Sequence, residues 1–308
     1  MPPAAACLML ARWQRWIILG ALLTAGIWGY ACWRADRPLW ALAGIVLLLC
    51  GHAAVLALEF LRLHRVNRDD PTPRATAGQL LRAWWGESRS ALRVFCWRQP
   101  FRARAYQDHL GTAAPDRKRR GVVLVHGFLC NRGIWNRWLR RLRALDVPVV
   151  AVNLEPVFGS IDHYADTIEQ AVQQIERATG QAPVLVGHSM GGLALRHWWA
   201  DAADDPRVHH AITLGTPHRG TWLARFAFSN NGRQMHLASD WHRHLVTRES
   251  PNRASKFTCF YSHCDNIVFQ ASTATLPGAD NRHLLAVAHV HMVERPEPFD
   301  ELLHRLTT

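Results

Sequence analysis

The sequence predicts an α/β fold: a doubly wound, mostly parallel sheet preceded by an N-terminal transmembrane helical hairpin. Short apolar runs rich in β-branched residues recur after residue 120, and helical patterns lie between several of them. Such runs are typical of strands buried on both faces of a parallel sheet. Their alternation with helices predicts helices on both faces of that sheet. Two long uncharged stretches before residue 60 predict the hairpin.

The first expected element is an apolar segment from Trp16 to Trp33, and a second runs from Leu39 to Leu58. Each is about the length that crosses a bilayer core as a helix. A cleaved signal peptide is the alternative for the first segment. However, no clear small-residue cleavage pattern follows it, and a second apolar span comes at once. We therefore expect residues 1–70 to form a membrane anchor with two transmembrane helices.

The distribution of basic residues suggests how the chain is oriented in the membrane and which partners it binds. The net charge is +12, and residues 71–120 hold eleven Lys and Arg against three Asp and Glu. Positive charge lies on every flank of the spans, with a bias that favours both termini in the cytoplasm. We expect a multi-pass protein of the bacterial inner membrane whose C-terminal domain lies in the cytoplasm. No nucleic acid is expected as a partner, because no recognised motif accompanies the charge. The sequence specifies no protein partner.

The next element, within residues 71–120, is a basic amphipathic linker. Bulky apolar residues and arginines alternate there at roughly helical spacing: Leu80, Leu81, Trp84, Trp85, Leu92, Phe95 and Trp97 with Arg82, Arg89, Arg93 and Arg98. One interpretation is a helix that lies on an anionic leaflet and makes membrane lipids a partner of the anchor and linker. The other is a helix that packs its tryptophans on the following domain.

Residues 121–308 are expected to form one domain. Strands are predicted at 121–125, 147–152, 184–186, 210–214, 257–261 and 283–288, and helices at 135–145, 164–178 and 190–203. The polar and partly aromatic segment at about 221–254 follows the fourth of these strands. It is predicted to be a small cap over the sheet.

The most informative motif is Gly187-His188-Ser189-Met190-Gly191, which follows a strand pattern and precedes helix-forming residues. A strained strand-to-helix turn of this kind exposes a serine Oγ, and small residues on either side let the turn close. The following helix places free N–H groups where an oxyanion develops. A glycine-rich turn in any βαβ unit is the alternative. The strand before and the helix after favour a nucleophile.

An elbow serine also needs a base and an acid that orients the base. Asp265 lies in the loop after the strand predicted at 257–261, at the strand end where such sheets place their sites. Asp280 is the second candidate for the acid. His289 and His291 compete for the base, and their spacing alone does not separate them.

Several motifs in this order resemble bacterial lipases and esterases of the α/β-hydrolase superfamily, over about 180 residues from Gly121 onward. The matching pieces are Val125-His126-Gly127-Phe128, the elbow at 187–192, the Gly-Thr-Pro-His turn at 214–221, the loop around Asp265, residues 276–279 and the terminal histidine segment. The resemblance implies a Ser-His-Asp triad. It also favours His289 over His291, because Met292 and Val293 follow at the family's positions.

The resemblance further implies an oxyanion hole formed by the backbone N–H groups of Phe128 and Met190. It gives supporting roles in the pocket or elbow to His126, Gly127, Gly187, His188 and Gly191, and a structural role to His218. No cofactor and no metal are expected, since the spacings of the remaining histidines fit no compact ligand set.

These motifs together predict a membrane-anchored serine hydrolase that cleaves carboxylic esters, with lipid acyl esters favoured because the anchor holds the site near a bilayer. The alternative is an acyltransferase or thioesterase with the same triad, because fold and triad do not select the acceptor. A non-catalytic membrane protein is the third possibility, and the ordered Ser, Asp and His argue against it.

Overall fold

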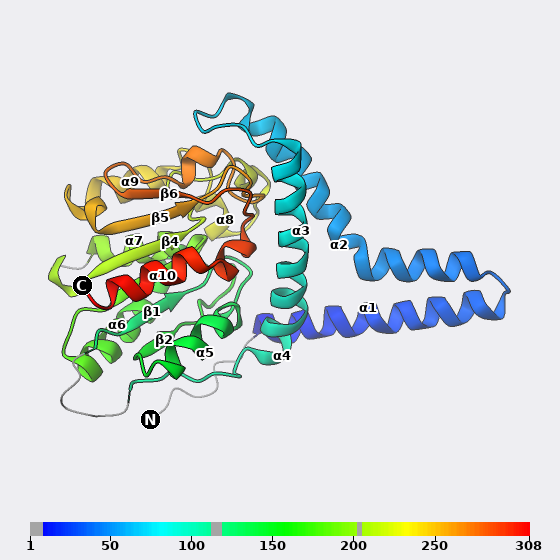
Figure 1. Cartoon of the computed structure of the whole chain (residues 1–308), viewed down its shortest axis with the longest axis horizontal. Coiled ribbons are helices and arrows are strands. Elements are labelled where there is room, and N and C mark those ends of the chain that lie inside the picture. Colours follow the sequence, from blue (N-terminus) through cyan, green and yellow to red (C-terminus); the bar gives the residue numbers. More distant parts are fainter. Residues whose placement is uncertain (1–8, 112–118, 202–204) are drawn as a thin grey trace.

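The computed structural model describes residues 9–111, 119–201 and 205–308. Residues 1–8 of the predicted anchor, 112–118 of the predicted linker and 202–203 of a predicted helix lie outside the described residues. A layered domain and a long helical hairpin that projects from one side of it make up the described chain (Figure 1).

A six-stranded sheet forms the centre of the domain, in the order β2-β1-β3-β4-β5-β6. The strands are β1 Val122–Val125, β2 Val149–Ala151, β3 Val184–His188, β4 His210–Leu214, β5 Phe257–Tyr261 and β6 Asp280–His283. Every neighbouring pair is parallel. The order reverses at β1, so the chain winds outward in both directions. The doubly wound parallel sheet predicted from the sequence is confirmed.

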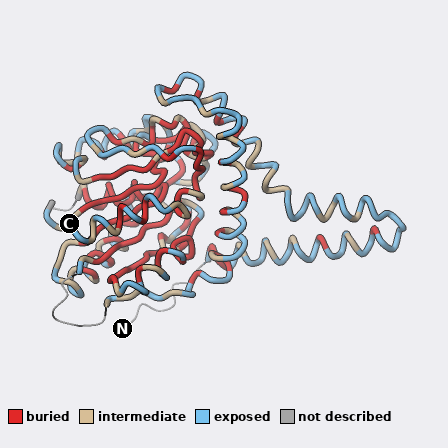
Figure 2. The backbone as a smooth tube through the Cα atoms, viewed as in Figure 1, coloured by how far each residue is buried: buried red, intermediate tan, exposed pale blue. Residues whose placement is uncertain are grey.

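Helices cover both faces of this sheet. The helices are α5 Asn136–Ala144 and α10 Pro296–Arg305 on one face, with α6 Ala165–Thr179 and α7 Met190–Asp201 on the other. Alternate strand residues divide between the two faces, because side chains along a strand point to opposite sides. Val122 and Leu124 pack with α5 and α10, whereas Val123 and Val125 pack with α6 and α7. Buried residues accordingly fill the interior of the domain (Figure 2).

The last strand differs from the sequence prediction, which placed it at 283–288. The structure has β6 at Asp280–His283, so the apolar run Leu284–Ala288 is a loop. The physical reason is that β6 lies at one edge of the sheet with mostly exposed side chains, so polar residues can form this strand. Leu284, Val287 and Ala288 are buried from the loop.

The N-terminal hairpin consists of α1 Met9–Arg34 and α2 Pro38–Val66, which lie side by side and extend away from the domain (Figure 1). By length and composition both helices are able to cross a membrane; 11% of the apolar window of α1 and 0% of that of α2 are buried. They are therefore not core helices of the domain. Both helices extend beyond the predicted spans, and the last turns of α2 leave the hairpin to meet the domain.

Helix α3 Ala77–Arg93 begins at a capping box made by Thr76 and Gln79, and the helix continues through η2 Val94–Arg98 into α4 Gln99–Arg102. One face of α3 packs on the domain against the turn η9 Val290–Glu294. The opposite face exposes Leu81, Trp85, Leu92 and their neighbouring arginines. One face of the linker helix therefore packs on the domain, as the second interpretation predicted. Contact of the other face with a membrane stays a prediction.

Short helices occupy the segment predicted as a cap: η6 Trp222–Phe226, α8 Asn230–Gln234 and α9 Asp240–Arg248. The buried guanidinium of Arg196 on α7 holds the residue that follows α9. Its Nε and Nη2 atoms donate to the carboxylate of Glu249 at 2.8 and 2.6 Å, and its Nη1 atom donates to the carbonyl of His218 at 2.8 Å.

Candidate active site

Ser189 stands on the turn between β3 and α7 with a positive φ of 55°. This left-handed conformation is unfavourable for a residue with a side chain and is held by the surrounding structure. One restraint is the hydrogen bond from the Ser189 N–H to the carbonyl of Leu214, at 2.8 Å. The serine is 6% exposed. The turn therefore has the strand, strain and helix that a nucleophile elbow requires.

Glycines are required where the elbow meets its neighbours. A Cβ on Gly191 would lie 2.4 Å from the carbonyl oxygen of Val125, and one on Gly187 would lie 2.6 Å from the Cα of Gly192. A Cβ on Gly127 would lie 2.7 Å from the Cβ of Ser189. The loop that carries Gly127 and Phe128 thus touches the serine directly.

Asp265 and His289 meet beside this turn. The Asp265 Oδ2 atom lies 2.9 Å from His289 Nδ1, and Oδ1 accepts from the N–H groups of Ile267 and Val268, each at 2.9 Å. Both side chains are buried. Because Asp265 holds Nδ1, the free imidazole nitrogen is Nε2, which is the geometry of a base oriented by an acid.

The end of β4 connects the elbow with this pair. Leu214 accepts the hydrogen bond from Ser189, and a Cβ on the next residue, Gly215, would lie 2.8 Å from Asp265 Oδ2 and 3.0 Å from His289 Nδ1. The backbone of a single dipeptide therefore touches all three residues that the sequence selected as a triad.

The pKa of His289 reflects two opposing effects. Burial lowers the pKa, but the Asp265 carboxylate together with the charges of Glu87 and Glu59 outweighs this effect, so the pKa lies above its usual value. These carboxylates therefore favour the protonated form of the His289 ring.

The competing candidates lie elsewhere. His291 packs under α3, where a Cβ on Gly86 would lie 2.4 Å from its Nδ1 atom. Asp280 is exposed and pairs with Arg282 at 2.7 Å. Neither side chain contacts the Asp265–His289 pair. Of the candidates, Asp265 and His289 are thus the two whose side chains pair beside the Ser189 turn.

The expected oxyanion donors lie on either side of Ser189. Met190 is the first residue of α7, so its N–H has no acceptor within the helix. Phe128 follows Gly127, which touches the serine, and the Phe128 ring meets the edge of Phe158 with 6.0 Å between centroids.

Two histidines support the site from within the core. His126 accepts from the N–H of Leu154 at Nε2 (3.0 Å) and faces the carbonyl of Gly127 at Nδ1 (2.9 Å). Burial lowers its pKa to about 4, so it is neutral and stabilises the turn. His188 lies 3.2 Å from the His289 carbonyl through Nε2, and burial lowers its pKa well below the usual range.

Residues from the N-terminal segment also reach the site, and sequence reasoning missed them. Glu87 of α3 accepts from the N–H groups of Val290 and His291, and Glu59 of α2 accepts from Asn266. Burial raises the pKa of Glu87 to about 7 against the opposing effect of His289. No local pattern in the sequence marks Glu87 or Glu59, because their partners lie about 200 positions later in the chain.

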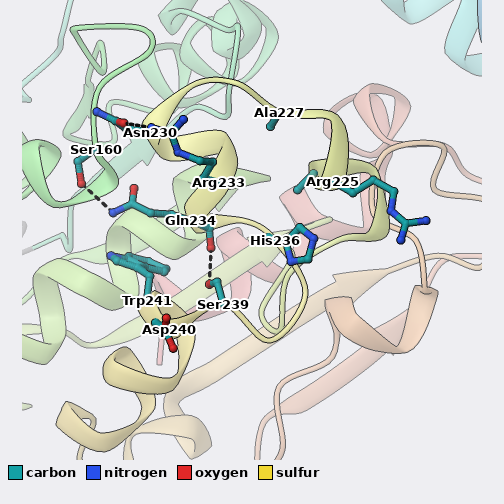
Figure 3. Close-up of a pocket in the computed structure, with 11 residues that line it drawn as sticks. Ser160, Arg225, Ala227, Asn230, Arg233, Gln234, His236, Ser239, Asp240 and Trp241 are labelled. Carbon is teal, nitrogen blue, oxygen red and sulfur yellow. Dashed lines mark hydrogen bonds between the residues drawn. The ribbon is translucent and has the colours of Figure 1, made fainter.

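A separate pocket of about 700 Å³ lies in the cap (Figure 3). It is lined by Ser160, Ala224, Arg225, Ala227, Asn230, Arg233, Gln234, His236, Ser239, Asp240 and Trp241. None of these residues belongs to the Ser189, Asp265 and His289 group. Within the described ranges, no group of three or more His, Cys, Asp or Glu is placed to hold a metal ion.

Residues 122–258 match the model of the alpha/beta hydrolase family. The chain has the fold of the α/β hydrolases. Solved structures similar to it include the mature form of the Bacillus licheniformis lipase BlEst2, with 18% identity and a TM-score of 0.55 over 63% of this chain and 95% of that one. Aspergillus fumigatus lipase B has 21% identity and a TM-score of 0.50 over 63% of this chain and 55% of its own.

Proposed function

We propose that this protein is a membrane-anchored serine hydrolase that cleaves carboxylic esters, with lipid acyl esters as its substrates. The observation that carries the proposal is the buried Asp265–His289 pair, 2.9 Å apart, beside a serine held at positive φ. The similarity to lipases supports the same reaction class.

In the proposed reaction the Ser189 Oγ attacks the acyl carbonyl while His289 Nε2 takes its proton. The N–H groups of Met190 and Phe128 bind the oxyanion of the tetrahedral intermediate. The carbon–oxygen bond to the alcohol then breaks, and His289 returns the proton to the leaving oxygen. A water molecule, deprotonated by the same histidine, attacks the acyl-enzyme and releases the acid. One ester and one water become one acid and one alcohol.

Lipid esters are supported by where the hairpin meets the domain. Trp13 of α1 stacks on Phe158 with 6.2 Å between centroids, and Phe158 in turn contacts Phe128. On the other side Glu59 of α2 bonds to Asn266, the residue after Asp265. Both contacts lie just outside the predicted spans, so a bilayer around the hairpin would lie close to the site. We place the anchor in the bacterial inner membrane and the catalytic domain on its cytoplasmic side.

Labelling with a fluorophosphonate tests the nucleophile. Ser189→Ala is expected to abolish labelling, because the probe reacts with an activated serine. Ser255→Ala, an exposed serine on a cap-side loop, is the matched control and is expected to label like wild type. Labelling of Ser189→Ala at the wild-type rate would contradict the proposal.

Product analysis distinguishes hydrolysis from the acyltransferase alternative. With a lipid ester in detergent micelles, free fatty acid is expected as the main product, with or without an added lipid alcohol. If the acyl group moved to the added alcohol and little free acid appeared, the activity would be acyl transfer. A chain-length series of p-nitrophenyl esters measures the acyl preference in the same preparation.

A further inference from the structure

Glu87 is a buried carboxylate that binds the backbone of the loop after His289. It is 2% exposed on the domain-facing side of α3. Its two oxygens accept from the N–H groups of Val290 and His291, at 3.0 and 2.9 Å. These groups open the turn η9 directly after His289, where N–H groups lack partners within the turn. The contact joins residues 203 and 204 positions apart.

A second carboxylate reaches the same histidine from α2. Glu59 Oε2 accepts from Asn266 Nδ2 at 2.7 Å, and Asn266 Oδ1 accepts from the backbone N–H of His289 at 3.3 Å. Asn266 therefore binds the backbone N–H of His289 itself, and Glu87 binds the backbone N–H groups of the two residues that follow. Both supports depend on the N-terminal segment.

Apolar packing reinforces the two polar contacts. One buried cluster joins α2 and α3 to the residues that precede Asp265 and His289. It consists of Phe60, Leu63, Ala83, Cys264, Phe269 and Ala288. Cys264 and Ala288 are the immediate neighbours of the acid and the base in the chain. The hairpin's domain-proximal end thus covers both catalytic loops.

We propose that Glu87 and, through Asn266, Glu59 are positioning residues that fix the backbone of His289, so that the N-terminal segment completes the active site besides tethering it. The proposal rests on the triad proposed above. A tether alone would need no buried carboxylate at the catalytic loop. Charge is costly to bury, and here it is matched to two specific backbone donors.

Glu87→Gln in the full-length protein is the first test. The amide keeps the shape but offers one acceptor, and its NH₂ group faces a backbone N–H. We expect kcat toward a p-nitrophenyl ester to fall on the order of tenfold, because small displacements of a catalytic group are costly. KM and the melting temperature are expected to change little. Glu176→Gln, a remote glutamate on α6 paired with Arg207, is the matched control and should keep wild-type kinetics.

The pH profile separates positioning from a merely structural role. The charged or titratable groups that face His289 are Asp265, Glu87, Glu59 and His188. The pKa of Glu87 is about 7, so its charge favours the imidazolium mainly above that pH. Glu87→Gln removes this contribution, and the acid limb of kcat/KM is therefore expected to move to lower pH. Glu87→Asp keeps the charge and is expected to leave the limb closer to that of wild type than Glu87→Gln does.

The outcomes are distinct. Wild-type kcat and an unmoved acid limb in Glu87→Gln would overturn the proposal, as would a loss that follows the melting temperature alone. If Glu87→Gln does not fold, Glu59→Gln is tested by the same two measurements. We then expect a lower kcat and an acid limb of kcat/KM that lies at lower pH than in wild type. Activity in Ser189→Ala would instead reject the proposed triad. An inactive Ser189→Ala with wild-type kinetics in both glutamate variants would reject the positioning role only.

Discussion

Gly191 is a position of the elbow where no side chain fits. A Cβ there would lie 2.4 Å from the carbonyl oxygen of Val125 and 2.6 Å from that of His126. Both obstacles are backbone atoms of the β1 strand and its loop, so they do not move aside easily. The elbow therefore depends on a missing side chain as much as on the serine itself.

Gly191→Ala is expected to cost about 1–3 kcal/mol of unfolding free energy, the scale of overpacking a close-packed site. Displacement of Ser189 should also slow fluorophosphonate labelling. Thermal unfolding and labelling rate measure the two effects. Gly78→Ala on α3 is the control, because a Cβ there meets nothing within 4 Å. A Gly191→Ala protein as stable and as reactive as wild type would contradict this packing.

The pH dependence follows from the environment of His289. Under the proposed reaction His289 must be neutral to take the Ser189 proton. Asp265, together with the charges of Glu87 and Glu59, raises the pKa of His289 beyond the lowering effect of burial. Activity is therefore expected to fall as the pH drops through a value above about 6.5, the usual histidine pKa. Asp265→Asn should move this limb to lower pH and lower kcat about 10³–10⁴-fold. A pH series of kcat/KM for both proteins measures the shift, and a limb below the usual value in wild type would contradict it.

At the residue scale the sequence contained strong local signals for Ser189 and Asp265, because a strand and a turn surround each of them. It could not separate His289 from His291, since both lie in one short loop. Glu59, Asn266 and Glu87 could not be predicted at all. Their contacts join segments about 200 positions apart, and no local pattern records such a pairing.

Among the elements, β6 shows why an apolar run is ambiguous. The run Leu284–Ala288 forms a loop with mostly buried side chains, whereas the polar Asp280–His283 forms the strand, because most β6 side chains are exposed at this edge of the sheet. The other five strands, including the edge strand β2, carried mostly apolar runs and were predicted to within a few residues. These strands could be predicted from the sequence because both of their faces are buried.

An ion pair between the buried Arg196 and Glu249 links the cap segment to α7. Arg196 is 1% exposed and Glu249 15% exposed at the side chain, with 2.6 Å between Nη2 and Oε2. Removing Glu249 leaves the guanidinium buried with an unpaired charge. Glu249→Ala is therefore expected to cost about 2–4 kcal/mol of unfolding free energy and to make residues 221–254 more sensitive to limited proteolysis.

Glu176→Ala is the comparison for this element. Glu176 and Arg207 form a similar pair on the surface, with 28% exposure on each side chain. An exposed pair contributes about 0–1 kcal/mol, so the melting temperature should hardly change. Equal effects of the two substitutions would show that burial of Arg196 does not set the strength of its pair.

At the scale of the whole molecule, the N-terminal hairpin presents a long exposed apolar surface. Large apolar side chains along both hairpin helices are exposed, among them Trp16, Leu23, Leu39 and Leu47 at 66–80%. A surface of this kind is characteristic of a membrane-contacting segment. Its length and composition were apparent from the sequence, whereas its attachment beside the active site was not.

A reporter fused after Thr308 tests the proposed orientation. Green fluorescent protein is expected to fluoresce and alkaline phosphatase to stay inactive, because the arginine bias favours a cytoplasmic C-terminus. The membrane fraction should hold the protein until detergent is added. Active phosphatase would place the domain on the periplasmic side and overturn the proposed localisation.

The pairing of Glu87 with Val290 also sets an order of events during synthesis. Ribosomes add roughly 5–20 residues per second, so the 203 positions between these partners take roughly 10–40 s to make. During that interval α3 has already left the ribosome, but the segment it supports does not yet exist. Under the proposed function, a nascent chain would therefore hold both hairpin helices before the segment that carries His289 exists. Catalysis would begin only after that segment has docked on α3.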